Sequence, residues 1–234
     1  MTSEVRVRTR VRPKNGRKFI LVANSKGGSG KSTLATNLAA AYARLGFDTC
    51  LVDCDQQRSS LAWMDMRPPT APLITAVSGC AEVGVPQLDW ALRVSPNTSR
   101  VIVDSPGAMR DQRLYDTLQK VDDILVPVLP SVVDIRATTE FLKEVFISPG
   151  FRTSNKRLFV IGNRVDKRNK YFHQLSRFLK RMGSHEVMTL PDSYVFLRCA
   201  DEGIGVADLT DSPRYEEPRT AMLKIINTIE TNAI

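Results

Sequence analysis

The sequence predicts an α/β fold in which helices flank a doubly wound, mostly parallel sheet. Short apolar runs recur along the chain, and several of them end in glycine, aspartate or asparagine. Such runs are typical of strands that are buried on both faces. Segments with helical periodicity separate the runs, and strands that alternate with helices indicate a parallel sheet. Because ligands of such sheets bind at the carboxyl ends of the strands, we expect the functional residues to lie there.

The predicted elements follow in order along the chain. Strands are expected at 18–25, 48–55, 99–107, 122–130 and 156–165, with a short one near 187–190. Helices are expected at 32–46, 112–120, 134–147, 169–182, 193–201 and 217–231. The first helix places four apolar residues on one face and ends at Gly46; the four are Leu34, Leu38, Ala41 and Leu45. The Pro- and Gly-rich segment 67–87 is interpreted as a surface connection that contains one short strand.

A single domain is expected from the length of 234 residues and from an ordinary globular composition, 42% hydrophobic and 25% charged. The alternating segment VRVRTRVR fits an edge strand or a mobile arm. We therefore place residues 1–17 in a basic N-terminal arm and residues 18–234 in the domain. No apolar run approaches the length of a membrane span, and the N-terminus lacks the hydrophobic stretch of a secretory signal, so a cytoplasmic protein is expected.

The cysteines argue against a metal-binding scaffold. The four of them, Cys50, Cys54, Cys80 and Cys199, form no CxxC pair, and the chain has two histidines. This pattern does not support a zinc or iron–sulfur site, so we expect reduced thiols.

The net charge of +8 is unevenly distributed. Residues 1–18 carry seven Lys and Arg against one Glu, and residues 152–181 carry ten against one Asp. These segments have net charges of +6 and +9, which leaves −7 for the rest of the chain. An acidic body with two basic patches predicts a polyanionic partner, and charge that only keeps the protein soluble is the alternative.

The segment GGSGKST has the composition of a phosphate-binding loop and lies between a predicted strand and a predicted helix. Its glycines let backbone N–H groups turn toward phosphate oxygens, and the start of the helix adds its positive dipole end. Lys31 is placed to reach the β and γ phosphates of a nucleotide, Ser32 to coordinate Mg²⁺, and Thr33 to reach the α phosphate. The predicted nucleotide-binding residues of the loop are Gly27, Gly28, Ser29, Gly30, Lys31, Ser32 and Thr33.

The segment KGGSGKST resembles the deviant Walker A box of the ParA/MinD family of ATPases. The resemblance runs from Phe19 to about Leu209 and includes LVDCDQQ, VIVDSPG, VPVLPS and IGNRV in the order of the family. The short ParA type is indicated, because residues 1–17 are too few for an N-terminal helix-turn-helix. The resemblance implies a P-loop NTPase fold, ATP and Mg²⁺ as cofactors, and hydrolysis that is slow without a partner.

Lys26 is a second lysine, at the front of the loop. The resemblance implies that it reaches across a nucleotide-sandwich dimer and contacts phosphates bound by the other subunit. It would act as an arginine finger does, because it completes the site only when a second molecule arrives. A solvated loop lysine is the alternative.

Asp53 and Asp55 follow the apolar residues of the second predicted strand. An i, i+2 pair on a strand points to the same side, so we expect both carboxylates beside the loop. The resemblance implies that Asp55 orients the attacking water and that Asp53 lies near the hydration shell of the magnesium ion. Relatives commonly have proline where this chain has Gln56, which is expected to loosen this switch segment.

Asp104 ends the apolar run of VIVDSPG and is a Walker B-type carboxylate, expected to bind Mg²⁺ through water. The segment that follows it, SPG, can form a second switch that senses the γ phosphate. The expected catalytic residues are thus Lys26, Lys31 and Asp55, and the expected metal-site residues are Ser32, Asp53 and Asp104.

Asn163, in IGNRV, follows a buried strand. Its carboxamide can both donate to and accept from an adenine edge, and the resemblance implies that task. Pro191 and Asp192 are expected to form the other wall of the base site. A simple turn residue is the alternative for Asn163.

The predicted helix 169–182 is amphipathic and basic. Its inward residues are expected to be Phe172, Leu175, Phe178 and Met182. Its cationic residues, which we expect to bind DNA, are Lys170, Arg177, Lys180 and Arg181. Such a stripe can lie along phosphates, so binding would be non-specific and strongly salt-dependent; a solvated helix face is the alternative.

These features together predict a nucleoid-associated positioning ATPase that forms an ATP-dependent homodimer. The resemblance implies that a cargo-bound adaptor or centromere-binding protein stimulates hydrolysis; cargoes in the family include plasmids, chromosome origins, chemoreceptor clusters and carboxysomes. A membrane-associated MinD-like regulator and a metabolic enzyme on the same fold are the alternatives. The C-terminal segment 218–234 has only Arg219 and Lys224 as basic residues, so no membrane partner is expected.

Overall fold

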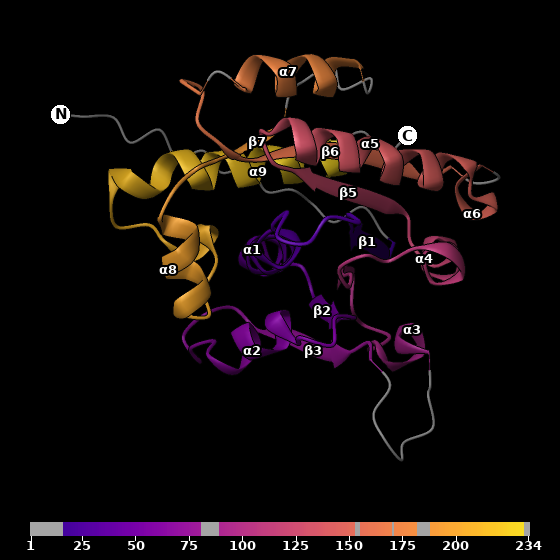
Figure 1. Ribbon diagram of the computed structural model, residues 1–234. Helices are drawn as coiled ribbons and strands as arrows, with labels where there is room; N and C mark the ends of the chain where they lie inside the picture. The colour runs from indigo at the N-terminus through magenta and orange to yellow at the C-terminus, as the bar shows by residue number, and fades with distance from the viewer. Residues whose placement is uncertain (1–15, 81–88, 153–154, 170, 182–187, 232–234) are drawn as a thin grey trace.

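A computed structural model describes residues 16–80, 89–152, 155–169, 171–181 and 188–231. Its centre is a seven-stranded sheet with the order β3-β2-β4-β1-β5-β6-β7, in which every described pairing is parallel (Figure 1). The strands are β1 (Lys18–Val22), β2 (Thr49–Asp53), β3 (Ile74–Ser78), β4 (Arg100–Asp104), β5 (Asp123–Val128), β6 (Arg157–Val165) and β7 (Thr189–Pro191). The predicted α/β class is confirmed.

Helices connect and cover these strands. They are α1 (Lys31–Arg44), α2 (Ser59–Asp65), α3 (Trp90–Arg93), α4 (Asp111–Gln119), α5 (Val132–Ile147), α6 (Pro149–Arg152), α7 (Phe172–Arg181), α8 (Val195–Asp201) and α9 (Glu216–Thr231). The sequence did not predict α2, α3 and α6. α3 and α6 have four residues each, and so short a segment cannot show a helical period; the seven-residue α2 was missed, although α8, of the same length, was predicted.

Several predicted strands are shorter in the structure. The runs expected at 18–25, 48–55 and 99–107 end as strands at Val22, Asp53 and Asp104. The residues that follow in each run leave the sheet and form the loops of the site. Burial does not mark the strand ends at β1 and β4, because Ala23 and Ser105, the first residues of the loops there, are also buried.

Two apolar clusters hold the layers together, one on each face of the sheet. Ile20 and Val22 of β1 join the cluster that includes α1 and α9, whereas Leu21 joins the cluster that includes α4, α5 and α7. This alternation is what a strand between two helical layers requires. In the first cluster α1 is buried along nearly its whole length, so it forms the central helix of the molecule.

The last helix, α9, is part of the core. Its apolar residues Met222, Ile225, Ile226 and Ile229 are buried in the same cluster as α1. The C-terminal apolar face is therefore covered within the protein. None of the helices in the described ranges is long and apolar enough to cross a membrane.

The strand order brings three loops together at the carboxyl edge of the sheet. β4 pairs with both β1 and β2, with Asp104 in register with Val22 on one side and Asp53 on the other. From β1 the chain continues to the β3 edge, and from β4 it continues toward the β7 edge (Figure 1). Ligands of open α/β sheets bind where the connections diverge in this way.

Candidate nucleotide-binding site

The loop between β1 and α1 has the backbone of a phosphate cradle. Gly28 and Gly30 have φ angles of 75° and 90°, which favour glycine. A Cβ on Gly30 would also lie 2.0 Å from Asn163 Nδ2, so a larger residue there would force the Asn163 side chain to move. In the described structure no side chain caps α1, which leaves the N–H groups of its first turn available to an anion.

A cleft of about 920 Å³ opens over this loop. The loops after β1, β2, β3 and β4 contribute to it, together with α4 and the residue after Asn163. Its lining includes Gly27, Gly28, Gly30, Lys31, Ser32, Thr33, Asp55, Gln56, Cys80, Gly107, Arg113, Lys120 and Arg164. Six of the seven predicted phosphate-binding residues thus line one cleft with the predicted water-orienting aspartate, whereas Ser29 is buried and does not line it.

The two lysines of the loop have different surroundings. The Lys31 side chain is only 7% exposed, and its Nζ donates to the backbone carbonyl of Lys26 at 3.4 Å. Burial lowers the pKa of Lys31, and the charges of Asp104 and Asp55 partly offset that effect. Lys26 is half-buried, and no carboxylate within the described residues forms an ion pair with it.

Asp104 is fully buried and lies beside two hydroxyl groups. Ser60 Oγ donates to Asp104 Oδ2 at 2.6 Å, and the hydroxyl of Ser32 is close enough to lower the pKa of this carboxyl group. Burial raises the pKa of Asp104 to about 6; the two hydroxyls and Lys31 oppose the shift, whereas Asp53 adds to it. Within the described residues, Asp104 Oδ1 is buried and has no hydrogen-bond partner.

Asp53 anchors the start of α2. Its Oδ1 accepts the backbone N–H of Asp55 at 2.9 Å, and its Oδ2 accepts those of Ser60 and Leu61 at 2.9 and 3.0 Å. The expectation that Asp53 and Asp55 form an i, i+2 pair on one strand is wrong, because β2 ends at Asp53. The chain turns there so that the buried carboxylate can satisfy three N–H groups of the segment that follows.

Asp55 lies on the cleft and joins the loops after β2 and β4. Its Oδ2 accepts the N–H of Gly107 at 3.2 Å, and its Oδ1 accepts that of Gln57 at 3.0 Å. The N–H of Ala108 in turn donates to the carbonyl of Ser25, in front of the glycine loop, at 3.2 Å. The two predicted switch segments therefore contact each other and the P-loop.

Residues 20–196 match the nucleotide-binding domain family described as CobQ/CobB/MinD/ParA. This chain belongs to that family. The match covers most of the chain and includes the loop, both switch segments and β6. The predicted resemblance to ParA and MinD proteins is confirmed.

Named relatives of this ParA/MinD family chain include carboxysome and partition proteins. The maintenance of carboxysome distribution protein A of Halothiobacillus neapolitanus is 28% identical over 199 residues, which are 81% of this chain and 87% of that protein. The protein of the same name from Gloeobacter kilaueensis is 33% identical over 154 residues, 65% of each chain. An ATP complex of Cyanothece McdA superposes with a TM-score of 0.69 at 15% identity, covering 90% of this chain and 96% of that one. At that identity the structure supports the fold alone.

The site of this ParA/MinD family member fits a magnesium ion. The unpartnered Asp104 Oδ1 can accept a hydrogen bond from a metal-bound water, and the Ser32 hydroxyl beside it can be a ligand. Across the described ranges, no group of three or more His, Cys, Asp and Glu side chains could hold a metal ion. A nucleotide-linked, largely hydrated Mg²⁺ needs no such group.

Asn163 contacts the P-loop of this family member. It is 4% exposed; its Nδ2 donates to the carbonyl of Ser29 at 2.8 Å, and its Oδ1 accepts the N–H of Arg164 at 3.0 Å. The side chain therefore holds the loop beside Gly30. Its predicted contact with adenine stays a prediction.

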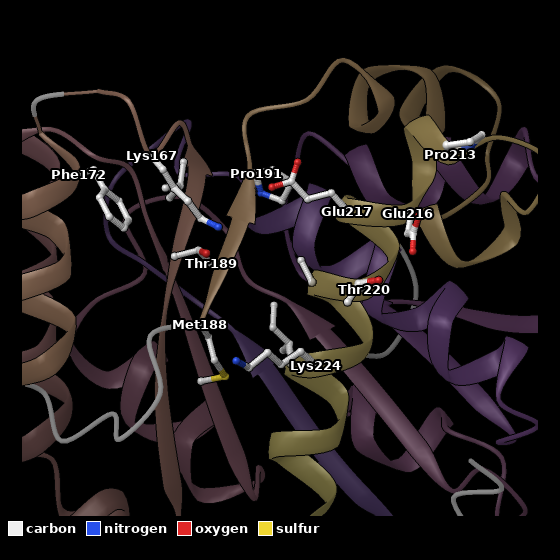
Figure 2. Close-up of a pocket in the computed structure, with 13 residues that line it drawn as sticks. Lys167, Phe172, Met188, Thr189, Pro191, Pro213, Glu216, Glu217, Thr220 and Lys224 are labelled. Atoms are coloured by element: carbon white, nitrogen blue, oxygen red, sulfur yellow. The ribbon is translucent and has the colours of Figure 1, made fainter. Parts of the chain in front are cut away.

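A second cavity, of about 550 Å³, lies at the β7 edge of the sheet between α9 and the segment after β6. In Figure 2, Lys167 and Lys224 extend toward Thr189 and Met188 from opposite sides. Pro191 lines this cavity and not the P-loop cleft, whereas Asp192 is exposed. The structure thus does not bring Pro191 and Asn163 into one cavity, although Pro191 pairs with Val165, two residues beyond Asn163.

The basic helix forms as α7, with Arg177, Lys180 and Arg181 exposed. Lys170 and Met182 lie outside the described residues. Leu175 and Leu179 are the buried residues of the helix, whereas Phe172 and Phe178 are only partly buried. The inward face is therefore rotated from the predicted one toward Leu179.

Three polar residues of the site were not predicted: Asn24, Ser60 and Arg164. Asn24 directly precedes the loop, but its Nδ2 donates to residues more than 100 positions away. Ser60 belongs to the unpredicted α2. Arg164 lines the cleft with a φ of 50°, an uncommon conformation for a residue with a Cβ. The pair Ser59–Ser60 before the apolar run LAWM is the one local signal that could have indicated the start of α2.

Proposed function

We propose that this chain is a positioning ATPase of the ParA type, which hydrolyses ATP to ADP and phosphate within an ATP-dependent homodimer. The names of its relatives support a positioning role: two are carboxysome distribution proteins, and others are named Protein ParA and the chromosome-partitioning ATPase Soj. The cargo of this chain would be of that kind, recognised through an adaptor or centromere-binding protein that accelerates hydrolysis.

The observation that carries the proposal is the difference between the two loop lysines. Lys31 is buried between the loop and two site carboxylates, so it serves the nucleotide of its own subunit. Lys26 is half-buried at the front of the loop with no acidic partner in the described ranges. A cation left open beside a phosphate cradle suits the nucleotide of a second subunit.

The remaining roles follow from the geometry of the cleft. The backbone of Gly28–Thr33 and the start of α1 would bind the phosphates. Ser32 and Asp104 would hold Mg²⁺, with Asp53 behind them; the ion would neutralise phosphate charge as hydrolysis proceeds. Asp55 would orient the attacking water once its contacts with Gln57 and Gly107 rearrange. These roles stay proposals.

Nucleoid association would depend on non-specific DNA binding. The exposed cations of α7 are the described candidates, and residues 1–15 of the N-terminal basic arm lie outside the described residues. Arg168 lies just before α7 and pairs with Asp166 at 2.9 Å, so part of the positive charge next to the helix is offset.

Replacing each loop lysine tests the proposal. Lys31→Ala should lose ATP binding, because it removes the buried cation of the cradle. Lys26→Ala should bind ATP with an affinity within about threefold of wild type yet lose turnover at least tenfold, because only the dimer needs Lys26. Isothermal titration with ATP and a phosphate-release assay measure the two quantities. Normal turnover by Lys26→Ala would contradict the sandwich dimer.

A further inference from the structure

Asn24 is a fully engaged carboxamide at the front of the P-loop. It is 1% exposed, and its Nδ2 donates to the carbonyl of Pro127 at 2.8 Å and to Oγ1 of Thr138 at 2.9 Å. Its Oδ1 accepts the backbone N–H of Lys26 at 3.1 Å. Both amide hydrogens and one acceptor position are therefore in use.

The partners of Asn24 belong to rigid elements. Pro127 lies in β5, a central strand, and Thr138 lies in α5 with no exposed surface. The N–H of Ala23 also donates to the carbonyl of Leu125 in β5, at 3.0 Å. The front of the loop is thus anchored to β5 and α5.

The back of the loop has a separate anchor. Asn163 of β6 donates to the carbonyl of Ser29, and Gly30 begins α1. Lys31 and the backbone N–H groups of the first turn of α1 follow directly after this second anchor. The loop therefore has two asparagine anchors, one at Lys26 and the other beside Lys31.

We propose that Asn24 is the positioning residue for Lys26, and that Thr138 of α5 holds Asn24 in place. The inference rests on the proposed function, in which Lys26 acts on the nucleotide of a second subunit. Loosening the front anchor should free Lys26 while the phosphate cradle stays intact. A change in α5 that moves Thr138 would then alter turnover and dimerisation but leave nucleotide affinity nearly unchanged.

One weak contact connects the two ends of the loop, and it limits how much a displaced Lys26 can change ATP affinity. Lys31 Nζ donates to the carbonyl of Lys26 at 3.4 Å, a long hydrogen bond. Displacing Lys26 should therefore alter ATP affinity only slightly, by less than about threefold.

Thr138→Val tests the inference, because it keeps the shape of the side chain and removes the acceptor for Asn24. We expect ATP affinity within about threefold of wild type, with ATP-dependent association and turnover each reduced about fivefold or more. Thr138→Ser restores the hydroxyl and should restore both. Thr139→Val is the matched control: its hydroxyl donates to Ile135 in the same helix and does not contact Asn24. Titration calorimetry, sedimentation velocity with ATP and phosphate release give the three readouts.

The outcomes separate the inference from the proposed function. If wild type associates and hydrolyses ATP, and a folded Thr138→Val does so equally well, the inference is wrong and the proposed function stands. Equal losses of affinity and turnover would also overturn it, since they would show a general loosening of the loop. A wild-type chain that binds ATP but neither associates nor hydrolyses it would overturn both. Asn24→Ala, with its fold checked by circular dichroism, should repeat the Thr138→Val result more strongly.

Discussion

Burial makes the charge of Asp104 unfavourable. The carboxyl group has no exposed surface, and burial raises its pKa to about 6, with Asp53 adding to the shift against the hydroxyls of Ser60 and Ser32. Since the folded-state pKa lies above that of the unfolded chain, the folded chain binds the proton more tightly. The stability that this proton contributes is present below about pH 4 and is lost as the pH rises through about 6.

Asp104→Asn should therefore stabilise the protein at pH 8 and not at pH 4. A shift of about two pKa units corresponds to roughly 3 kcal/mol in the free energy of unfolding, as an upper value. Urea unfolding at the two pH values, without Mg²⁺ and nucleotide, measures the difference. Asp65→Asn, at an exposed position on α2, is the control. An equal change in the free energy of unfolding at both pH values would show that the pKa of Asp104 is not raised in the folded protein.

Single residues also show where the sequence was informative. Gly30 and Lys31 were predicted because a glycine loop between a strand and a helix is a local pattern. Asn163 was assigned to adenine because its chemistry suits a base. Its observed contact with Ser29 depends on the approach of β6 to the loop, which no local pattern contains.

At the scale of elements, α7 presents its charges outward and buries Leu175 and Leu179. Lys180 and Arg181 lie in its last turn, where positive charge also stabilises the helix dipole. The exposed cations can therefore serve the helix, DNA or both. A salt series distinguishes these roles, because phosphate contacts alone release counterions.

The double variant Arg177→Ala, Arg181→Ala should weaken ATP-dependent DNA binding and lower its salt slope. Each lost phosphate contact reduces the slope by about one, so a reduction of about two is expected. Fluorescence anisotropy with non-specific duplex DNA over a salt series measures it. Arg44→Ala, Arg214→Ala removes the same charge from exposed positions elsewhere and should leave the slope unchanged. An unaltered slope in the α7 variant would place the contacts elsewhere.

α2 shows why a short helix can be missed when elements are predicted from the sequence alone. It has seven residues, and two carboxylates of the site hold its first turn: Asp53 accepts its N–H groups and Asp104 accepts the Ser60 hydroxyl. These contacts are tertiary. The long α1 and α5, by contrast, show several helical turns of apolar periodicity.

At the scale of the whole molecule, a buried ion network closes the end of the sheet opposite the site. Arg100 of β4, 1% exposed, donates to Glu230 of α9 at 3.0 and 2.8 Å. Lys18 lies 3.5 Å from the same carboxylate, and Tyr42 of α1 donates to it at 3.0 Å. Burial alone would raise the pKa of Glu230, but Arg100 and Lys18 outweigh that effect and hold it below its usual value.

Glu230→Ala should destabilise the fold, because it leaves the Arg100 guanidinium buried without its carboxylate. Removing one partner of a buried pair costs about 3 kcal/mol or more. Urea unfolding at pH 7 measures the loss. Glu202→Ala removes the partner of Arg198 in a more exposed pair and should cost less than about 1 kcal/mol. Equal decreases in the free energy of unfolding of the two variants would show that the buried network stabilises the fold no more than an exposed ion pair does.

The sequence by itself determined the α/β class, the P-loop and the family, because apolar runs, helical periodicity and a glycine-rich loop are properties of neighbouring residues. Tertiary structure alone decided the anchors: Asn24 on Thr138, Asn163 on Ser29 and Ser60 on Asp104. Each anchor joins residues from different strands or helices, and a buried polar group takes whichever partner the packing of those elements provides. Local sequence motifs therefore supply the chemical groups of the site, whereas the positions of these groups depend on the assembled sheet.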